Sequence, residues 1–508
     1  MVPVPNRQEE RLPALRQRLR ARYPLLQLVA ADERDALRLL ETAAAEVGLP
    51  LRVVHYGASE PMPTALAGLA ALVQATQPSL LVLPDGHRLL RQPGLARAVV
   101  EALTDLERVG HVVVFLTPVP VACLELHRDL VTLTVPLPGQ MELEPLARAA
   151  LSDGQGRVAP ALLQASVQAL RGMTQAQARR ALRRVRQEGL QAQAAAVLQD
   201  EKRDLVASGG LLEIIEAVPH LDAVGGLDDL KAWLLRRRKA LEPEARAFGL
   251  PPPRGVLVVG VQGCGKSLVC KASAAALGVP LVRLDLGRLH TSATVPDENL
   301  RHALAVAEAM APCVLWLDEI DKAFAHALTG ASEAGARLLG SLLTWLGEQQ
   351  AGVFVAATAN RVDHLPAELL RKGRFDETFF VDLPDATVRA EILALHLKKS
   401  GRDPAAFAIE TLAKAADRLT GAEIEQAIVE ALAHAYAEAR PLAEADVQAA
   451  LSKTVPLVET YEPQVKALRE WARRRCRPAA RDRSLRDLYA AALVPASPGA
   501  GTGAGAGS

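Results

Sequence analysis

Short apolar runs of strand length alternate with longer amphipathic stretches along most of the chain. In the first 140 residues these runs lie at 25–30, 51–56, 79–84, 111–117 and 131–137. A strand, a helical pattern and another strand form the order of a βαβ unit, whose strands pair in parallel. The pattern therefore predicts an α/β domain with a parallel sheet at residues 1–142.

The same alternation, together with shifts in composition, divides the rest of the chain. The predicted segments are a helical lid-like segment at 143–200, a linker at 201–221, a second α/β domain at 222–385, a second helical lid at 386–455, a basic helical tail at 456–490 and a disordered tail at 491–508. The last of these is composed of Ala, Gly, Ser and Pro almost throughout, which cannot bury enough apolar surface to fold.

Composition narrows the class of protein. Half of the 508 residues are hydrophobic but only 3% are aromatic, so the cores must consist of Ala, Leu and Val. A net charge of +1 argues against a protein that coats nucleic acid. The five cysteines form no CxxC pair, which favours a reducing, cytoplasmic location. We see no apolar run of about 18 residues, so we expect no membrane span.

A phosphate-binding loop follows the apolar run at 255–259. The segment from Gly260 to Ser267 reads GVQGCGKS, the GxxxxGKS pattern, and an Ala/Leu/Val-rich helical stretch follows it. Backbone N–H groups of such a loop and the start of the helix bind phosphate oxygens. Lys266 would reach the β- and γ-phosphates, and Ser267 would ligate Mg²⁺. The nucleotide-contacting residues assigned here are Gly260, Gly263, Cys264, Gly265, Lys266, Ser267 and Leu268.

Polar residues end the next two buried strands. The run at 313–317 leads into Asp318, expected to hold Mg²⁺, and Glu319, expected to polarise the attacking water. The run at 353–359 leads into Asn360, whose amide can orient that water or sense the γ-phosphate. The sequence thus predicts ATP and Mg²⁺ as cofactors of a hydrolase.

Two arginines, Arg371 and Arg374, follow a strand and turn and have no phosphate of their own to bind. Their guanidinium forks suit the γ-phosphate bound to a neighbouring subunit. The alternative for Arg374 is a salt bridge within its own chain.

At this point the chain resembles the AAA family of the AAA+ superfamily over residues 222 to 452. The motifs that carry the resemblance are VGGL at 224–227, the phosphate loop, LDEID at 317–321, ATAN at 357–360, LLRKGRFD at 369–376 and TGAEI at 420–424. The wider pattern, including FGLPPPRG at 248–255, is similar to AAA proteins first recorded as a hypothetical reading frame of chloroplast genomes. That likeness extends over nearly the whole chain.

The resemblance implies roles for individual residues. It places Gly225, Gly421 and Ala422 near the adenine, makes Asn360 a sensor and makes Arg371 and Arg374 arginine fingers acting on the next subunit. It also implies a homo-oligomer, expected to be a hexameric ring. One departure stands out, since His290 occupies the place of the aromatic residue that grips a threaded polypeptide. Strong threading through a pore is therefore not expected.

The first domain reads as a copy of the second without its active site. Residues 48–51 match 278–281 at an offset of 230, and 135–138 match 381–384 at an offset of 246. The loop equivalent, Ala30 to Leu37, has no lysine and carries three carboxylates, and Pro84 replaces Asp318. The alternative is that any two α/β domains share such strand patterns.

Two functions from different classes remain open. The first is an oligomeric Mg-dependent ATPase that remodels a protein partner, favoured by Glu319 and the two arginines. The second is an ATP-dependent scaffold or regulatory switch with slow turnover and no threading, favoured by His290 and the inactive first domain. A nucleic-acid motor is a weaker third reading, because no recognition motif accompanies the basic runs.

Overall fold

The computed structural model describes residues 11–56, 61–152, 157–208, 210–290, 296–328, 333–348 and 352–480. The chain divides into two compact units, the first made of Met1–Leu212 with Thr291–Ala311 and the second of Glu213–His290 with Pro312–Ser508. Residues 296–311 thus group with the first unit by their contacts, although they lie within the segment 222–385 predicted as the second α/β domain. Each unit is described separately below.

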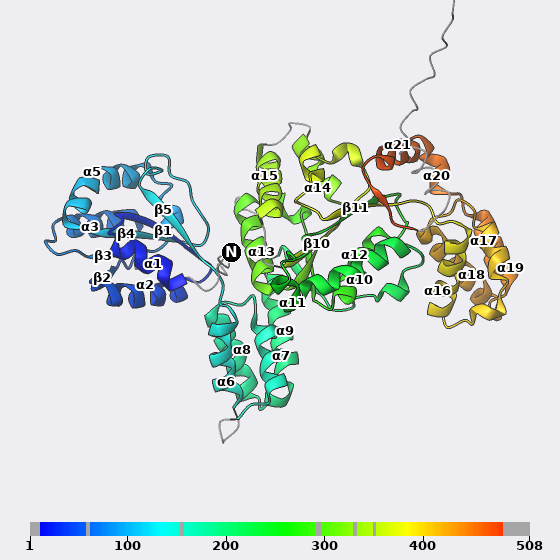
Figure 1. Cartoon of the computed structure of the whole chain (residues 1–508), viewed down its shortest axis with the longest axis horizontal. Coiled ribbons are helices and arrows are strands. Elements are labelled where there is room, and N and C mark those ends of the chain that lie inside the picture. The colour runs from blue at the N-terminus through cyan, green and yellow to red at the C-terminus, as the bar shows by residue number, and fades with distance from the viewer. Residues whose placement is uncertain are drawn as a thin grey trace, which may run out of the picture. The chain divides into compact units, whose positions relative to one another are not determined.

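The first unit contains a five-stranded parallel sheet, ordered β2-β3-β4-β1-β5 (Figure 1). Its strands are β1 (Leu25–Ala30), β2 (Leu51–Val53), β3 (Leu80–Leu83), β4 (Val112–Thr117) and β5 (Leu130–Val135). One core joins the sheet to α1 (Arg11–Arg20) and α2 (Glu33–Val47). Another joins it to α3 (Pro61–Val73) and α5 (Pro93–Val109). The short helix α4 (Gly86–Leu89) follows β3.

A separate helical core follows this sheet in the chain. It is built by α6 (Gln140–Leu151), α7 (Pro160–Leu170), α8 (Gln175–Gln187) and α9 (Ala194–Ser208). The helix α13 (Pro296–Met310) also belongs to the first unit. Part of the predicted linker is regular, because α9 continues to Ser208 and a strand begins at Leu212.

The second unit contains a seven-stranded sheet, ordered β12-β11-β7-β10-β9-β8-β6. Its strands are β6 (Leu212–Ile215), β7 (Gly255–Gly260), β8 (Leu281–Leu284), β9 (Cys313–Leu317), β10 (Val353–Ala359), β11 (Glu377–Val381) and β12 (Arg477–Pro478). The helices of its α/β part are α10 (Asp228–Arg238), α11 (Pro243–Ala247), α12 (Lys266–Leu277), α14 (Ile320–Leu328) and α15 (Glu333–Glu348).

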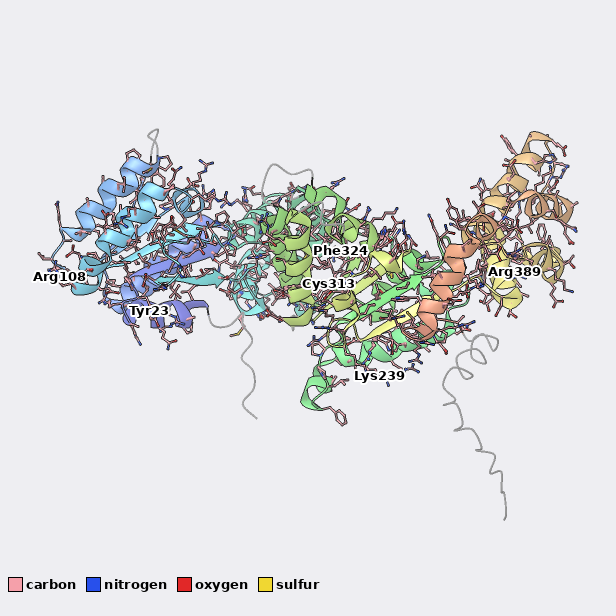
Figure 2. All side chains as sticks on the ribbon, turned by 90° about the horizontal axis from the view of Figure 1, so that it is seen from above. Tyr23, Arg108, Lys239, Cys313, Phe324 and Arg389 are labelled. Atoms are coloured by element: carbon pink, nitrogen blue, oxygen red, sulfur yellow. The ribbon has the colours of Figure 1, made fainter. Side chains whose placement is uncertain are left out.

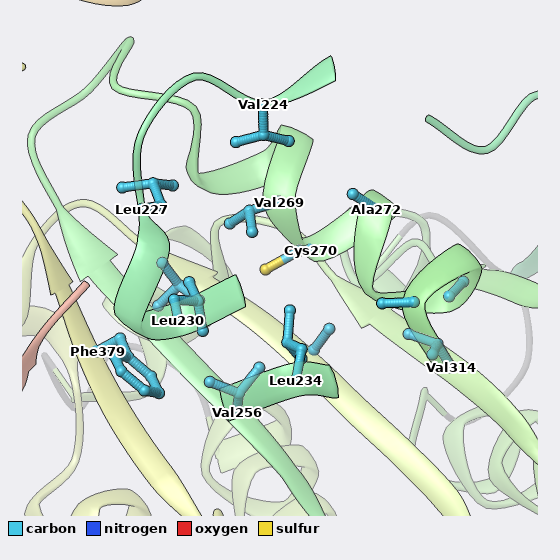
Figure 3. Packing of buried hydrophobic residues seen from close by; sticks show 14 of the residues in the cluster. Val224, Leu227, Leu230, Leu234, Val256, Val269, Cys270, Ala272, Val314 and Phe379 are labelled. Atoms are coloured by element: carbon cyan, nitrogen blue, oxygen red, sulfur yellow. The ribbon is translucent and has the colours of Figure 1, made fainter. Parts of the chain in front are cut away.

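The core of this α/β part is aliphatic with a small aromatic centre. Leu230 and Leu234 of α10 and Val269 of α12 pack over the sheet residues Val256 and Phe379 (Figure 3). Trp233 lies edge-on to Phe379, with ring centroids 5.6 Å apart. This packing holds α12, and with it the phosphate loop, against the sheet.

A helical lid completes the second unit. Its helices are α16 (Ala386–Lys399), α17 (Ile409–Ala415), α18 (Gly421–Ala437) and α19 (Glu444–Lys453), which share one core. Buried Arg389 of α16 (Figure 2) donates from Nε to the carbonyl of Ala413 at 2.8 Å and from Nη1 to that of Pro384 at 3.1 Å. Beyond the lid come α20 (Leu457–Thr460) and α21 (Glu462–Arg473), so the predicted basic helical tail at 456–490 is helical as far as Arg473 and then contains the strand β12. Its residues 481–490 and the predicted disordered tail at 491–508 lie outside the described residues.

The two sheets repeat one topology. The order β2-β3-β4-β1-β5 recurs in the second sheet as β8-β9-β10-β7-β11, with β6 and β12 added at the edges. The pairing registers match the offsets of 230 and 246, and they place Leu116 rather than Thr117 opposite Thr358 in the repeat. Equivalent pairs are Ala30–Val135 and Gly260–Val381, Leu28–Leu116 and Val258–Thr358, and Leu51–Leu80 and Leu281–Val314. The internal repeat is therefore confirmed at the level of strand register.

Candidate active site

The phosphate loop joins β7 to α12 at the carboxyl edge of the sheet. Gly263 and Gly265 adopt left-handed φ angles of 79° and 85°, which glycine alone adopts without strain. A Cβ on Gly263 would lie 2.9 Å from the hydroxyl of Thr420, so the loop is also closed against the lid. The loop therefore has the backbone geometry that presents N–H groups at the start of a helix.

Lys266 is buried at the first position of α12. Its Nζ donates to the carbonyls of Gly260 at 2.9 Å and Val261 at 2.6 Å. Burial lowers the pKa of this ammonium, while the nearby carboxylates of Asp321 and Asp318 act in the opposite direction. A phosphate group would satisfy this desolvated cation far better than backbone carbonyls do.

A hydroxyl–carboxylate cluster follows at the ends of β9 and β10. Asp318 Oδ1 accepts from Ser267 Oγ at 2.8 Å and from Thr358 Oγ1 at 2.7 Å. Ser267 and Asp318 supply hard oxygen ligands of the kind that Mg²⁺ prefers. No group of three or more His, Cys, Asp or Glu side chains among the described residues could hold a metal ion alone. Ser267 and Asp318 would hold a Mg²⁺ here together with oxygens of the bound phosphate.

Glu319 is held from both sides. Its Oε1 accepts from Asn360 Nδ2 at 2.9 Å, and its Oε2 lies 2.6 Å from Lys322 Nζ. Its backbone has a left-handed φ of 49°, a conformation that costs a non-glycine residue about 1–3 kcal/mol. The N–H of Glu319 donates to Thr358 Oγ1 at 2.8 Å, which helps to retain this conformation. The carboxylate is thus aimed by neighbours rather than free to rotate.

Asp321 and Thr358 are buried site residues that were not singled out from the sequence. Asp321 accepts from the backbone N–H groups of Asn360 at 3.2 Å and Arg361 at 3.1 Å, and burial raises the pKa of its carboxyl. It thereby fixes the turn that carries Asn360. Both lie inside motifs quoted above, LDEID and ATAN. Only the fold shows that Asp321 bonds to the residues after β10 and that Thr358 bonds to the residues after β9.

Gly225, Cys264 and Gly421 line one cavity together with Asp382 and Ile392. A Cβ on Gly225 would lie 2.7 Å from Ile392 Cγ1, so only glycine fits there. Ala422 is not part of the lining but donates its N–H to the carbonyl of Gly263 at 3.0 Å. Leu268 lies on α12 with 38% of its surface exposed and is likewise outside the lining.

Arg371 is exposed and Arg374 is half-buried beyond β10. Among the residues that the structure describes, neither forms an ion pair, and Nη1 of Arg374 is buried without a hydrogen-bond partner. The alternative for Arg374, a salt bridge within its own chain, is therefore not seen among the described residues. A partner from another subunit stays a prediction.

The match to known proteins decides the family. Residues 256–383 match the "ATPase family associated with various cellular activities (AAA)" and residues 10–135 match the "SpoVK-like AAA ATPase, N-terminal domain". The "Uncharacterized AAA domain-containing protein ycf46" of Guillardia theta is 35% identical over 402 residues, 78% of this chain and 79% of that protein. Its counterpart in Trieres chinensis is 30% identical over 472 residues, 89% of this chain and 95% of that protein. The chain belongs to this AAA family.

Further relatives match a shorter part. The ycf46 protein of Pyropia yezoensis is 42% identical over 279 residues, and the match spans 54% of this chain but only 57% of that protein. The "ATP-dependent zinc metalloprotease FtsH 1" of Symbiobacterium thermophilum is 34% identical over 254 residues, 46% of this chain and 43% of that protein. This AAA protein is accordingly an ATPase, which binds and hydrolyses ATP. No helix in the described ranges is long and apolar enough to cross a membrane.

The first unit of this AAA protein keeps the backbone of the site but not its chemistry. Asp85, which aligns with Glu319, has a φ of 50° and so repeats the same left-handed conformation. At the loop equivalent, Asp32 caps α2 and also accepts from Thr174 Oγ1 at 3.2 Å. Asp35 accepts from the N–H of Gln175 at 2.9 Å. Carboxylates of the chain itself therefore occupy the start of α8, where the second unit has the start of α18.

The predicted pore segment lies largely outside the described residues. Residues 291–295 are not described, and of His290 only the backbone is, as the end of a short 3-10 helix at Gly287–His290. The expectation that His290 weakens threading remains a prediction.

Proposed function

We propose that this AAA protein hydrolyses Mg·ATP at the loop, strand ends and lid of its second unit, working as a homo-oligomer that remodels a protein partner. The observation that carries the proposal is the cluster at the ends of β9 and β10. There Ser267 and Thr358 orient Asp318, while Asn360 orients Glu319. Bound Mg²⁺ would neutralise charge that develops on the transferring phosphate.

In this mechanism the chain's own residues bind the nucleotide phosphates and the metal ion and position the attacking water. Lys266 would turn from the carbonyls of Gly260 and Val261 to the phosphates, and Ser267 with Asp318 would hold the metal ion. Glu319 would accept the proton of the attacking water from the position set by Asn360. Arg371 and Arg374 would stabilise the transition-state charge on the nucleotide of the neighbouring subunit.

The test is ATP turnover by the full chain with and without excess Mg²⁺, next to Glu319→Gln. We expect chelation of the metal to abolish turnover, and Glu319→Gln to retain ATP binding while turnover falls by orders of magnitude. A protein partner should then be captured by Glu319→Gln in the presence of ATP but not ADP. Wild-type turnover in Glu319→Gln would rule out the assigned base.

A second function, an ATP-dependent switch with slow turnover, is favoured by one contact. Lys322 Nζ lies 2.6 Å from Glu319 Oε2, and this hydrogen bond raises the pKa of the lysine. A base engaged by a cation accepts a proton less readily, which slows hydrolysis. If turnover stays slow with every protein offered while ATP and ADP states bind a partner differently, the switch is the better description.

A further inference from the structure

The segment 456–480, called here the C-terminal strap, crosses the nucleotide site of the second unit. It comprises α20, α21 and β12. Val458 and Val465 of the strap form a small buried cluster with Val261 of the phosphate loop, against which Cys264 and Leu383 pack. Ala480, at the end of the strap, lines the same cavity as Gly225 and Gly421. The strap therefore forms part of the wall of the site.

Both ends of the strap form hydrogen bonds through their backbone with the parts of the second unit that surround the cavity, namely the lid, β11 and α10. At its start, the N–H of Leu457 donates to Glu423 Oε1 at 2.6 Å, and the other oxygen of Glu423 accepts from the N–H of Thr420 at 2.7 Å. At its end, the N–H of Ala479 donates to the carbonyl of Phe380 at 3.0 Å. The carbonyl of Ala479 accepts from the first residues of α10. The strap thus bridges the lid and the sheet edge.

One side chain of the strap forms a charged fork with the cavity wall. Arg469 Nε lies 3.0 Å from Oδ1 and 2.8 Å from Oδ2 of Asp382, and its Nη2 lies 2.9 Å from Oδ1. Asp382 directly follows β11, lines the cavity and has a side chain that is only 9% exposed, against 42% for Arg469. Another cavity carboxylate, Asp385, accepts from the N–H of Val388 as the cap of α16. Of these two cavity carboxylates, Asp382 is therefore paired with an arginine, whereas Asp385 caps a helix.

We propose that Arg469 is a positioning residue for the nucleotide, which makes the cavity acceptable to a triphosphate anion by cancelling the charge of Asp382. The inference rests on the assignment of ATP to this pocket. The charge of an unpaired carboxylate at low exposure is weakly screened by solvent and repels the polyanion. With the fork in place, Asp382 also stays turned toward the strap, with the N–H of Leu383 donating to its Oδ1 at 2.8 Å.

The test is a charge-rescue series in the full chain, read out as the Kd of Mg·ATP by titration calorimetry at low ionic strength. Arg469→Gln should raise the Kd on the order of tenfold, because Asp382 is left unpaired. Adding Asp382→Asn should restore the Kd to within about threefold of wild type, because the unpaired charge is removed. Arg473→Gln, an exposed arginine of the same helix, is the matched control and should bind as wild type.

If the Arg469–Asp382 ion pair only stabilises the fold, the variants would give different Kd values. The double variant would then bind ATP as weakly as Arg469→Gln, or more weakly, and the proposal would be overturned; so would an Arg469→Gln variant that binds normally. Should Arg469→Gln fail to fold, Asp382→Asn alone decides, since it should bind at least as tightly as wild type and tenfold weaker binding contradicts the proposal. Lys266→Ala distinguishes failure of this proposal from failure of the assigned ATP site. If Lys266→Ala binds ATP like wild type, the assignment of ATP to this pocket is itself wrong.

Discussion

Thr358→Val tests the buried hydroxyl that joins the two strand ends of the active site. Thr358 is 1% exposed, and its Oγ1 donates to Asp318 at 2.7 Å while accepting from the N–H of Glu319 at 2.8 Å. Valine has nearly the same shape, so little packing is lost. A lost hydrogen bond to a carboxylate contributes roughly 1.5–3 kcal/mol, and a buried N–H without a partner costs roughly 1–3 kcal/mol. We expect the second unit to lose about 3 kcal/mol of stability.

The consequence for activity follows from the same atom. Without Thr358 Oγ1, Asp318 keeps only Ser267 as a hydroxyl donor, and Glu319 loses the contact that stabilises its left-handed backbone. We expect a Mg²⁺ requirement shifted to higher concentration and a kcat lower by on the order of tenfold. Thr358→Ser, which keeps the hydroxyl, is the matched control and should retain most of the activity.

All four tryptophans, Trp233, Trp316, Trp345 and Trp471, lie in the second unit, so their fluorescence reports the unfolding of this unit alone. Urea titration followed by tryptophan emission gives the stability change, and phosphate release over a Mg²⁺ series gives the kinetic change. The reasoning is refuted if Thr358→Val matches wild type in both, or if Thr358→Ser is as impaired as Thr358→Val.

Further predictions follow from the same contacts. Lys266→Ala in the full chain should abolish all ATP binding, because the first unit offers carboxylates in place of a phosphate site; calorimetry that still shows saturable micromolar binding would contradict this. Mixing inactive Lys266→Ala chains with inactive Arg374→Ala chains should restore part of the turnover, whereas no recovery in confirmed mixed oligomers argues against fingers acting between subunits. Lys322→Met should raise kcat severalfold, because Glu319 loses a competing cation, and an unchanged or lower kcat would assign Lys322 a supporting role instead. An Asp32→Ala variant should loosen α8, seen as faster amide exchange at Gln177, whose N–H donates to Thr174 Oγ1 at 3.2 Å, while exchange within α18 stays unchanged.

The sequence determined the local chemistry of this protein. The glycines and Lys266 of the loop, and the polar residues that end the strands at Asp318 and Asn360, follow directly from adjacency along the chain. The repeat could also be predicted from the sequence, because matching segments occur in the same order in both halves of the chain. Two halves with the same order of strands and helices are expected to form similar parallel sheets. The loop and strand-end motifs depend on neighbours within about one turn or one strand, and the repeat depends on matching motifs in the same order, so both can be read from residue order.

Only the tertiary structure decided which distant groups meet. Thr358 joins Asp318 and Glu319 across strands, Arg469 meets Asp382 from 87 residues away, and Asp32 meets Thr174 from 142 residues away. No sequence motif predicts these contacts, because each depends on how helices and strand ends pack in the folded protein. A carboxylate at low exposure must be neutralised or hydrogen-bonded by something. Which group does so depends on the fold, because the packing of helices and strand ends determines which side chains lie next to the carboxylate.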